Sequence, residues 1–318
     1  MKEMCVAMAS ESMQAVFGRV PYPWQKDVIS HVVRMTLPRS TLVCAPILCV
    51  RSTGGGKSAV RDTIGNIFSG VSLTISPLLS LAADQVSKIR SSSTQAAGTI
   101  IARNLDEIKG SAAHSAFALQ LEGIQGDTAA TIYLFASPQA IVNNIIWRNL
   151  LTSLITRKLL RLVCIDEAHL FAKFGLYFRT EFYKLRPVLF QPLMFSSREP
   201  TTLRIPVLFL TATASREIVS QLELLTGFVF QKSGNILWPT HEHMQRRNVY
   251  IGIQMTEQTL RYFKQLAKPI LHDTSSANLK KVILYTNNRS SADTFRMNVR
   301  HWLNEANVPG DVVPLNGK

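Results

Sequence analysis

Two stretches of this 318-residue sequence carry groups that could bind and cleave a phosphate chain. The first, RSTGGGKSAV (residues 51–60), follows an apolar run and leads into a helical pattern. Glycines let the backbone approach a polyphosphate, and successive N–H groups at the start of the next helix point at its charge. Lys57 would reach the β- and γ-phosphates, and the Ser58 hydroxyl would ligate Mg²⁺. We therefore expect a nucleotide-binding loop at Thr53, Gly54, Gly55, Gly56, Lys57 and Ser58. The strict pattern has Gly at position 51, where this chain has Arg, and the alternative is a structural glycine turn.

The second stretch, RLVCIDEAHLFAKFGLYFR (residues 161–179), is an apolar run that ends in Asp166 and Glu167. Ligands bind at the carboxyl ends of the strands of an open parallel sheet. There Asp166 would hold the Mg²⁺ shell, and Glu167 would orient and deprotonate the water that attacks the γ-phosphate. The alternative is two solvated acids that cap a helix. Together the stretches predict a catalytic set of Lys57, Asp166 and Glu167, with Ser58 and Asp166 at the metal.

Short apolar runs alternate with helical patterns along the chain, which predicts an α/β fold with a parallel sheet covered by helices on both faces. Expected strands span residues 41–50, 71–76, 130–136, 161–165 and 206–211, and expected helices include 57–68, 78–89 and 138–150.

We expect a first domain over residues 1–238, a linker at 239–247, and a second, incomplete domain over 248–318. The second domain would hold strands at 248–254 and 281–286 and helices at 259–267 and 291–303. Two strands and two helices cannot form a complete sheet with helices on both faces.

Thirty-five Lys and Arg residues against 21 acids give a net charge of +14, which favours a polyanionic partner, either nucleic acid or an anionic membrane surface. No apolar run approaches the roughly 18 residues that span a bilayer, so we expect no membrane partner. The N-terminus lacks an apolar signal core, which indicates an intracellular protein. Cys44, Cys49 and Cys164 lie in apolar runs as expected of reduced core cysteines, and His241–His243 lacks a second ligand cluster for a metal.

Six collinear motifs resemble those of the RecQ-like DNA helicases of superfamily 2. Besides TGGGKS and IDEAH they are SPLLSLAADQV (76–86), ASPQAIV (136–142), LFLTATAS (208–215) and ILYTNNRSSAD (283–293). The resemblance runs from about Phe17 to the C-terminus. It implies a RecA-like P-loop NTPase domain followed by an incomplete second RecA-like domain.

The resemblance also implies roles for residues outside the two stretches. Gln25 would recognise the adenine edge, although Tyr22 stands where the family usually has Arg. His169, Thr211 and Thr213 would carry the state of the γ-phosphate to the interdomain cleft. In the motif ILYTNNRSSAD (283–293), Asn288 and Arg289 would contact nucleic acid.

The segment after IDEAH is similar to the aromatic-rich loop with which RecQ enzymes sense single-stranded DNA. Bases can stack on its rings and phosphates can pair with its cations. The expected DNA-binding residues are Lys173, Phe174, Tyr177, Phe178 and Arg179, while Phe171 and Phe178 could equally be core.

The resemblance thus implies an ATP-dependent 3′–5′ DNA helicase that uses ATP and Mg²⁺ and acts on single-stranded or forked DNA. Its location would be the nucleus in a eukaryote and the cytoplasm otherwise, and its protein partners stay open. In this family the second RecA-like domain also carries a motif V and a motif VI, whose arginine reaches the γ-phosphate. The sequence has neither, so we expect a truncated product with weak or no activity alone. The alternatives are a nucleotide-regulated nucleic-acid-binding module and a DEAH-type RNA helicase.

Overall fold

The computed structural model describes residues 2–36, 46–92, 100–124, 130–175, 180–196, 205–230, 236–237, 261, 264–265 and 289–305. The chain divides into two compact units, Met1–Arg246 and Arg247–Lys318. The first unit contains both stretches that could bind a phosphate chain. That the second unit is part of a second motor domain stays a prediction.

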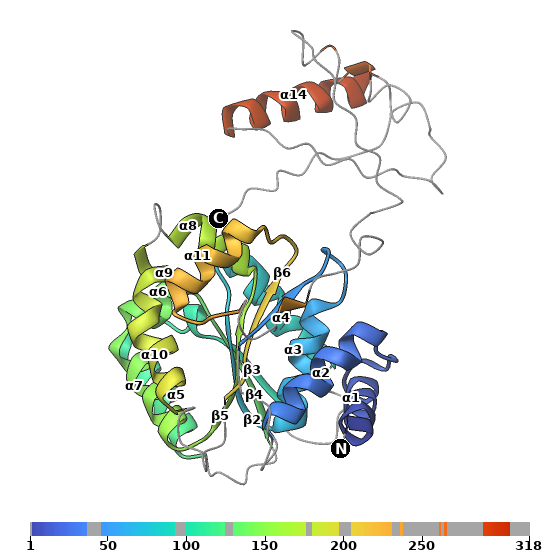
Figure 1. Ribbon diagram of the computed structural model, residues 1–318. Coiled ribbons are helices and arrows are strands. Elements are labelled where there is room, and N and C mark those ends of the chain that lie inside the picture. The colour runs from blue at the N-terminus through green and yellow to red at the C-terminus, as the bar shows by residue number, and fades with distance from the viewer. Residues whose placement is uncertain are drawn as a thin grey trace. The chain divides into compact units, whose positions relative to one another are not determined.

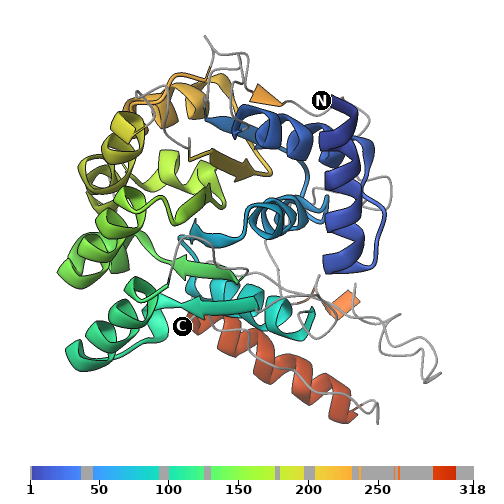
Figure 2. The same cartoon turned by 90° about the horizontal axis from the view of Figure 1, so that it is seen from below.

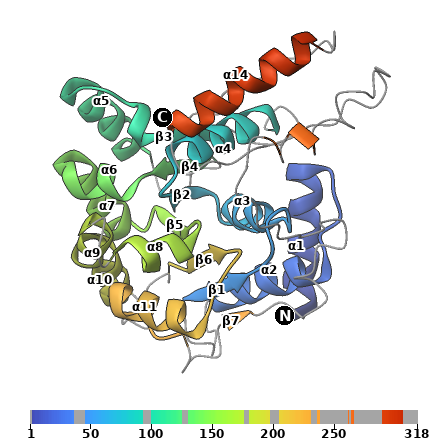
Figure 3. The same cartoon turned by 90° about the horizontal axis from the view of Figure 1, so that it is seen from above.

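The first unit is built on one parallel sheet (Figure 1), with the strand order β3-β4-β2-β5-β6-β1-β7 (Figure 3). Because all strands run the same way, their carboxyl ends meet at one edge, where the segments after β1, β5 and β6 lie next to one another. The strands are β1 (Ile47–Val50), β2 (Gly70–Ile75), β3 (Ile100–Asn104), β4 (Thr131–Ala136), β5 (Leu160–Ile165), β6 (Val207–Thr211) and β7 (Ile236–Leu237).

Both faces of the sheet are covered, as the continuous apolar runs predicted. In β1, Ile47 and Cys49 pack with helices α1 (Lys2–Phe17), α2 (Pro23–Thr36) and α3 (Lys57–Phe68). Leu48 and Val50 belong to a larger cluster with the later helices on the opposite face. The blue helices α1–α3 and the green-to-yellow helices α6–α11 therefore lie on opposite sides of the sheet (Figures 2 and 3).

The remaining helices of the first unit follow the expected alternation with strands. Through Ala82, Val86 and Ile89, helix α4 packs on Tyr133 and Phe135 of β4. These helices are α4 (Leu79–Ser92), the 3-10 turn η2 (Leu105–Glu107), α5 (Ser111–Glu122), α6 (Pro138–Asn143), α7 (Ile145–Thr156), α8 (Ala168–Gly175), α9 (Thr180–Leu185), the π-helical η3 (Arg186–Phe190), α10 (Gln191–Ser196) and α11 (Arg216–Thr226).

The single helix expected over residues 138–150 is wrong. The segment forms α6 and α7, which are separated at Asn144. Asn144 has extended backbone angles, φ −115° and ψ 112°, and its side-chain oxygen accepts the backbone N–H groups of Ile146 and Trp147. An Asn that caps a new helix in this way ends one helix and starts the next, while the apolar residues keep helical spacing on both sides of it.

The elements that were not expected from the sequence include α1, α2, β3 and β7. Strand β3 is the sequence IIARN, which is too short and too polar to stand out as a buried strand. Of the strand expected at 41–50, the structure describes Ile47–Val50, and residues 37–45 lie outside the described residues.

In the second unit the structure describes one long helix, α14 (Arg289–Glu305), which contains the helix expected at 291–303. Trp302 is buried at 8% exposure, and the Lys264 ammonium lies 5.3 Å from the centroid of its ring. The strands expected at 248–254 and 281–286 lie outside the described residues.

Candidate nucleotide-binding site

The phosphate-loop candidate connects β1 to α3 at the carboxyl edge of the sheet. Gly54 and Gly56 have φ values of +80° and +84°, in the left-handed region that favours glycine. The Gly55 N–H donates to the Ser52 carbonyl at 3.0 Å and closes a tight turn. Gly56 then caps α3, so the loop delivers the chain directly into a helix N-terminus, where anions are favoured.

Lys57, the first residue of α3, is bent back over this loop. Its ammonium donates to the Arg51 carbonyl at 2.8 Å and to the Ser52 carbonyl at 3.1 Å, and the residue is only 9% exposed. Ser58 follows on the same helix and is half-buried, while Thr53 and Gly54 are exposed. The loop backbone is therefore exposed to solvent at Thr53 and Gly54, and the Lys57 ammonium lies against the loop carbonyls.

Gln25 of α2 is part of the same site. Its amide nitrogen donates to the Gly56 carbonyl at 3.0 Å, and its amide oxygen accepts the Tyr22 N–H at 2.8 Å. Gln25 is buried, with 3% of its surface exposed. The expected adenine-binding residue thus contacts the expected phosphate loop.

Arg51, which replaces the first glycine of the strict loop pattern, lies over a ring. Its guanidinium carbon is 4.9 Å from the centroid of Trp24. Within the described part of the chain, its Nε and Nη1 atoms are buried and have no hydrogen-bond partner. The substitution therefore adds a cation to the loop beside the Gln25 segment.

The two adjacent acids lie at the tip of β5, one strand away from the loop across β6. Asp166 is 4% exposed, and its Oδ1 accepts the Glu167 N–H at 3.0 Å. Glu167 has a φ of +47°, a conformation that costs a non-glycine residue about 1–2 kcal/mol. The backbone thus turns sharply between the acids. Because Asp166 is buried, the alternative of two solvated acids that cap a helix is wrong.

His169 connects Glu167 to β6. Its Nδ1 lies 3.2 Å from Glu167 Oε2 and 2.9 Å from Thr211 Oγ1. The Thr211 hydroxyl donates its one hydrogen to the Thr213 carbonyl at 2.8 Å, so toward His169 it can only accept. Nδ1 must therefore carry the proton. The three expected coupling residues, His169, Thr211 and Thr213, form one hydrogen-bonded group with Glu167.

The loop and the acids share one site. The Arg51 N–H donates to the Thr211 carbonyl at 3.0 Å, which ties the end of β1 to the end of β6. The hydrogen bond from His169 lowers the pKa of Glu167 despite the opposing effect of burial, and the charges of His169 and Lys57 lower it further. Lys57 and Glu167 therefore lie on the same edge of the sheet, one after β1 and the other after β5.

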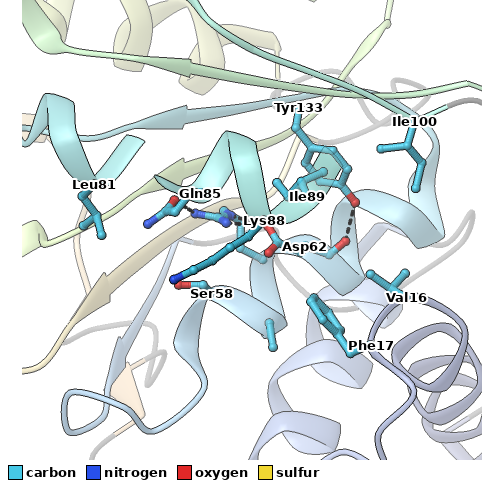
Figure 4. Close-up of a pocket in the computed structure, with 12 residues that line it drawn as sticks. Val16, Phe17, Ser58, Asp62, Leu81, Gln85, Lys88, Ile89, Ile100 and Tyr133 are labelled. Atoms are coloured by element: carbon cyan, nitrogen blue, oxygen red, sulfur yellow. Dashed lines mark hydrogen bonds and ion pairs between the residues drawn. The ribbon is translucent and has the colours of Figure 1, made fainter. Parts of the chain in front are cut away.

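Sequence reasoning missed a group of buried polar residues behind this site (Figure 4). Gln85 of α4 donates its amide to Asp166 Oδ2 at 3.0 Å. Arg61 of α3 donates Nη1 to the Gln85 oxygen and Nε to Asp62 at 2.7 Å. In the sequence Gln85 lies within the motif SPLLSLAADQV, whereas Arg61 and Asp62 belong to no motif, and charged residues on a helix are usually exposed.

Ser58 and Asp166 fit a magnesium ion. Mg²⁺ is usually bound through one or two carboxylates together with substrate phosphates and water, and a hydroxyl with one buried carboxylate matches that donor set. No group of three or more His, Cys, Asp or Glu side chains that could hold a metal occurs among the residues that the structure describes. An ion here would therefore depend on nucleotide phosphates for most of its ligands.

A family model described as DEAD/DEAH box helicase matches residues 22–221, which include the loop, both acids and the residues of β6. This chain belongs to the DEAD/DEAH box helicase family. As a DEAD/DEAH box protein it is similar in sequence to RecQ-like DNA helicases. It is 28% identical to the ATP-dependent DNA helicase Q-like 4B of Arabidopsis thaliana over 69% of this chain and 17% of that protein. It is 33% identical to the RecQ-like DNA helicase BLM of Xenopus laevis over 58% of this chain and 12% of that protein.

A bacterial relative covers more of the chain, since the RecQ helicase of Haemophilus influenzae is 24% identical over 80% of this chain and 35% of that protein. The chain thus spans well under half the length of these relatives. Solved structures share the RecA-like fold. The helicase MrfA bound to DNA and AMPPNP superimposes with a TM-score of 0.62 at 14% identity, over 94% of this chain and 39% of that one. Yeast Dbp5 bound to RNA and ADP BeF3 gives 0.57 at 11% identity, over 93% and 66%.

The expected DNA-binding residues of this family member are only partly described. Lys173 is exposed on α8, whereas Phe171 is buried and packs edge-on against Phe182 at 4.4 Å, which confirms it as core. Tyr177, Phe178, Arg179 and Asn288 lie outside the described residues, and the side chains of Phe174 and Arg289 are likewise not described. No helix within the described ranges is long and apolar enough to cross a membrane.

Proposed function

We propose that this chain contains the ATP-binding half of a RecQ-type helicase motor, which couples ATP hydrolysis to 3′–5′ movement on single-stranded DNA and to duplex unwinding. The observation that carries the proposal is the bond from the Arg51 N–H to the Thr211 carbonyl, which brings the Lys57 loop next to the hydrogen-bonded group of Glu167, His169 and Thr211. A glycine turn with a structural role would not need these partners.

The residues divide the hydrolytic work between them. Bound Mg²⁺-ATP would supply the scissile phosphate and the metal that stabilises its negative charge. Lys57 and the N–H groups at the start of α3 are placed to bind the phosphates, and Ser58 and Asp166 to hold the metal. Glu167, with its lowered pKa, is a carboxylate at neutral pH and can accept the proton of a water molecule.

The His169–Thr211–Thr213 group offers a route from Glu167 to the segment after β6. Loss of the γ-phosphate would change the charge near Glu167 and so alter its hydrogen bond with His169. Because His169 is also bonded to Thr211, and Thr211 to the Thr213 backbone, the Thr213 backbone would shift as well. Bistable hydrogen bonds of this kind are one means by which nucleotide state moves a distant element. We assign these residues to the coupling of hydrolysis with movement.

The DNA substrate is inferred from charge and from relatives. The net charge of +14 favours a nucleic acid, and the sequence relatives reported above are named DNA helicases. Lys173, Phe174, Tyr177, Phe178 and Arg179 would contact a single strand, with Asn288 and Arg289 adding contacts from residues 248–318. A fork with a 3′ tail would be the preferred substrate and the nucleus the site of action in a eukaryote.

The test is an ATPase assay with and without single-stranded DNA, with single-stranded RNA as the comparison. Stimulation by DNA but not RNA supports the proposal, and stronger stimulation by RNA would indicate an RNA helicase instead. Binding of ATP and DNA without any turnover would indicate a nucleotide-regulated binding module. Lys57→Ala should abolish nucleotide binding, whereas Glu167→Gln should keep it and lose hydrolysis.

A further inference from the structure

A line of buried hydrogen bonds reaches the metal-binding candidate Asp166 from behind. It begins at the Arg61–Asp62 pair, whose charged atoms are 2.6 Å apart, and passes through Gln85 to Asp166 Oδ2 at 3.0 Å. Arg61 is 1% exposed and Gln85 6% exposed. A buried arginine is costly unless its donors are satisfied, so its presence beside a catalytic acid calls for a physical reason.

The chemistry of the two ends fixes the amide between them. Arg61 can only donate hydrogen bonds, so the Gln85 atom that faces it must be the oxygen. Ionised Asp166 can only accept, so the atom that faces it must be the nitrogen. Of the common side chains of this length, only glutamine offers an acceptor on one side and a donor on the other without taking up a proton.

Arg61 is itself held on several sides. Its Nε and Nη2 meet Asp62, and its guanidinium carbon lies 4.9 Å from the centroid of the Phe135 ring. The Tyr133 hydroxyl donates to the Asp62 carbonyl at 2.6 Å. The amide of Gln85 therefore receives its orientation from a rigid group anchored on α3 and β4.

The Asp166 carboxylate is consequently held at both oxygens. Oδ1 accepts the Glu167 N–H at 3.0 Å and Oδ2 accepts the Gln85 amide at 3.0 Å, so rotation of the carboxylate breaks both hydrogen bonds. Ser58 and Gln85 line a common cavity of about 190 Å³ between α3 and α4 (Figure 4). The glutamine thus lines the same cavity as the residue whose hydroxyl we assign to the same metal.

We propose that Gln85 is a positioning residue that orients Asp166 for Mg²⁺, with Arg61 fixing the amide in the donating direction. This inference rests on the proposed function, in which Asp166 holds the metal of Mg²⁺-ATP. It predicts that Gln85 contributes to the part of nucleotide affinity that depends on Mg²⁺.

The experiment measures binding of AMPPNP by calorimetry on the full chain, once with MgCl₂ and once with EDTA. The ratio of the two dissociation constants is the magnesium gain. Gln85→Glu keeps an acceptor for Arg61 and loses the donor to Asp166, while Gln85→Met loses both. A hydrogen bond to a charged group typically contributes enough for about a tenfold effect, so we expect the magnesium gain to fall about tenfold in both variants.

The matched control is Gln221→Met in α11. Gln221 also donates its amide to a carboxylate, Glu217, at 3.3 Å, but this pair is exposed and lies within α11. Its magnesium gain should equal that of the wild type. If Gln85→Met fails to fold, Gln85→Glu still decides, since its carboxylate can pair with Arg61.

A second readout uses stability without any ligand. In the double variant Gln85→Glu/Asp166→Asn the donor and acceptor are exchanged, because the amide introduced at position 166 can donate to the carboxylate introduced at position 85. We expect its melting temperature to recover most of what Gln85→Glu alone loses. A folded Gln85→Glu protein with the wild-type magnesium gain, or a double variant that shows no recovery, overturns the positioning role. A wild-type chain with no magnesium gain would refute the proposed function itself.

Discussion

Two glycines of the phosphate loop allow the cost of a left-handed backbone to be measured separately from the effect of a clash with a neighbouring side chain. Gly54 and Gly56 have nearly the same φ, +80° and +84°. A Cβ at Gly54 would meet nothing within 4 Å, whereas a Cβ at Gly56 would lie 2.6 Å from the amide nitrogen of Gln25. Alanine at either position has the same left-handed backbone cost, about 1–2 kcal/mol.

Only Gly56→Ala should also displace Gln25. That displacement breaks the bond from Gln25 to the Gly56 carbonyl and the bond from the Tyr22 N–H to Gln25, at about 0.5–1.5 kcal/mol each. We therefore expect Gly56→Ala to lower the free energy of unfolding by about 1–3 kcal/mol more than Gly54→Ala. Urea unfolding without nucleotide, followed by circular dichroism, measures the difference. Equal losses in the two variants would show that Gln25 is not held by the loop as described.

Three further predictions concern single side chains. Arg51→Met should leave the free energy of unfolding unchanged or raise it. The variant loses a cation–π contact of about 0.5–1 kcal/mol, but it also removes two buried nitrogen atoms that have no hydrogen-bond partner. A clear loss of stability in urea unfolding would contradict this. Burial raises the pKa of Cys49 from 9.0 to about 11, although the charges of Arg51 and Lys57 oppose the rise. As the pH rises, the Cys49 thiolate therefore forms first in the unfolded chain, and the free energy of unfolding should fall between pH 9.0 and about 11. Cys49→Ala should make that fall shallower in pH-dependent urea titrations, and identical slopes would argue against it. His169→Ala should leave nucleotide binding intact while uncoupling ATPase activity from DNA, which DNA titrations of the hydrolysis rate would test.

Much of the site was predictable because its chemistry is local in sequence. The glycines, Lys57 and Ser58 lie within one turn and the start of one helix, and the acids follow a strand whose apolar run is unmistakable. The parallel sheet and its helix-covered faces were confirmed, since alternation of strand and helix patterns leaves few other arrangements.

What the sequence could not supply is the set of contacts between distant segments. Gln85 and Asp166 are 81 residues apart, and nothing in either pattern shows that they touch. Arg61 and Asp62 were passed over because charged residues on a helix are usually solvent-exposed, whereas here α4 and β4 cover them. Asn144 was missed as a helix boundary because both segments that it separates have helical periodicity.

The first helix has a practical consequence for anyone who trims this protein. The family match starts at residue 22 and so leaves out α1, yet Ser12 of α1 bonds the Thr63 carbonyl at 3.4 Å and accepts the Asn66 amide at 3.1 Å. Cys5, Ala9 and Met13 pack in the same cluster as Val60 and Ile64 of α3. A version cut to the family boundary would strip the outer support from the helix that carries Lys57, so poor nucleotide binding by such a fragment would say little about the intact chain.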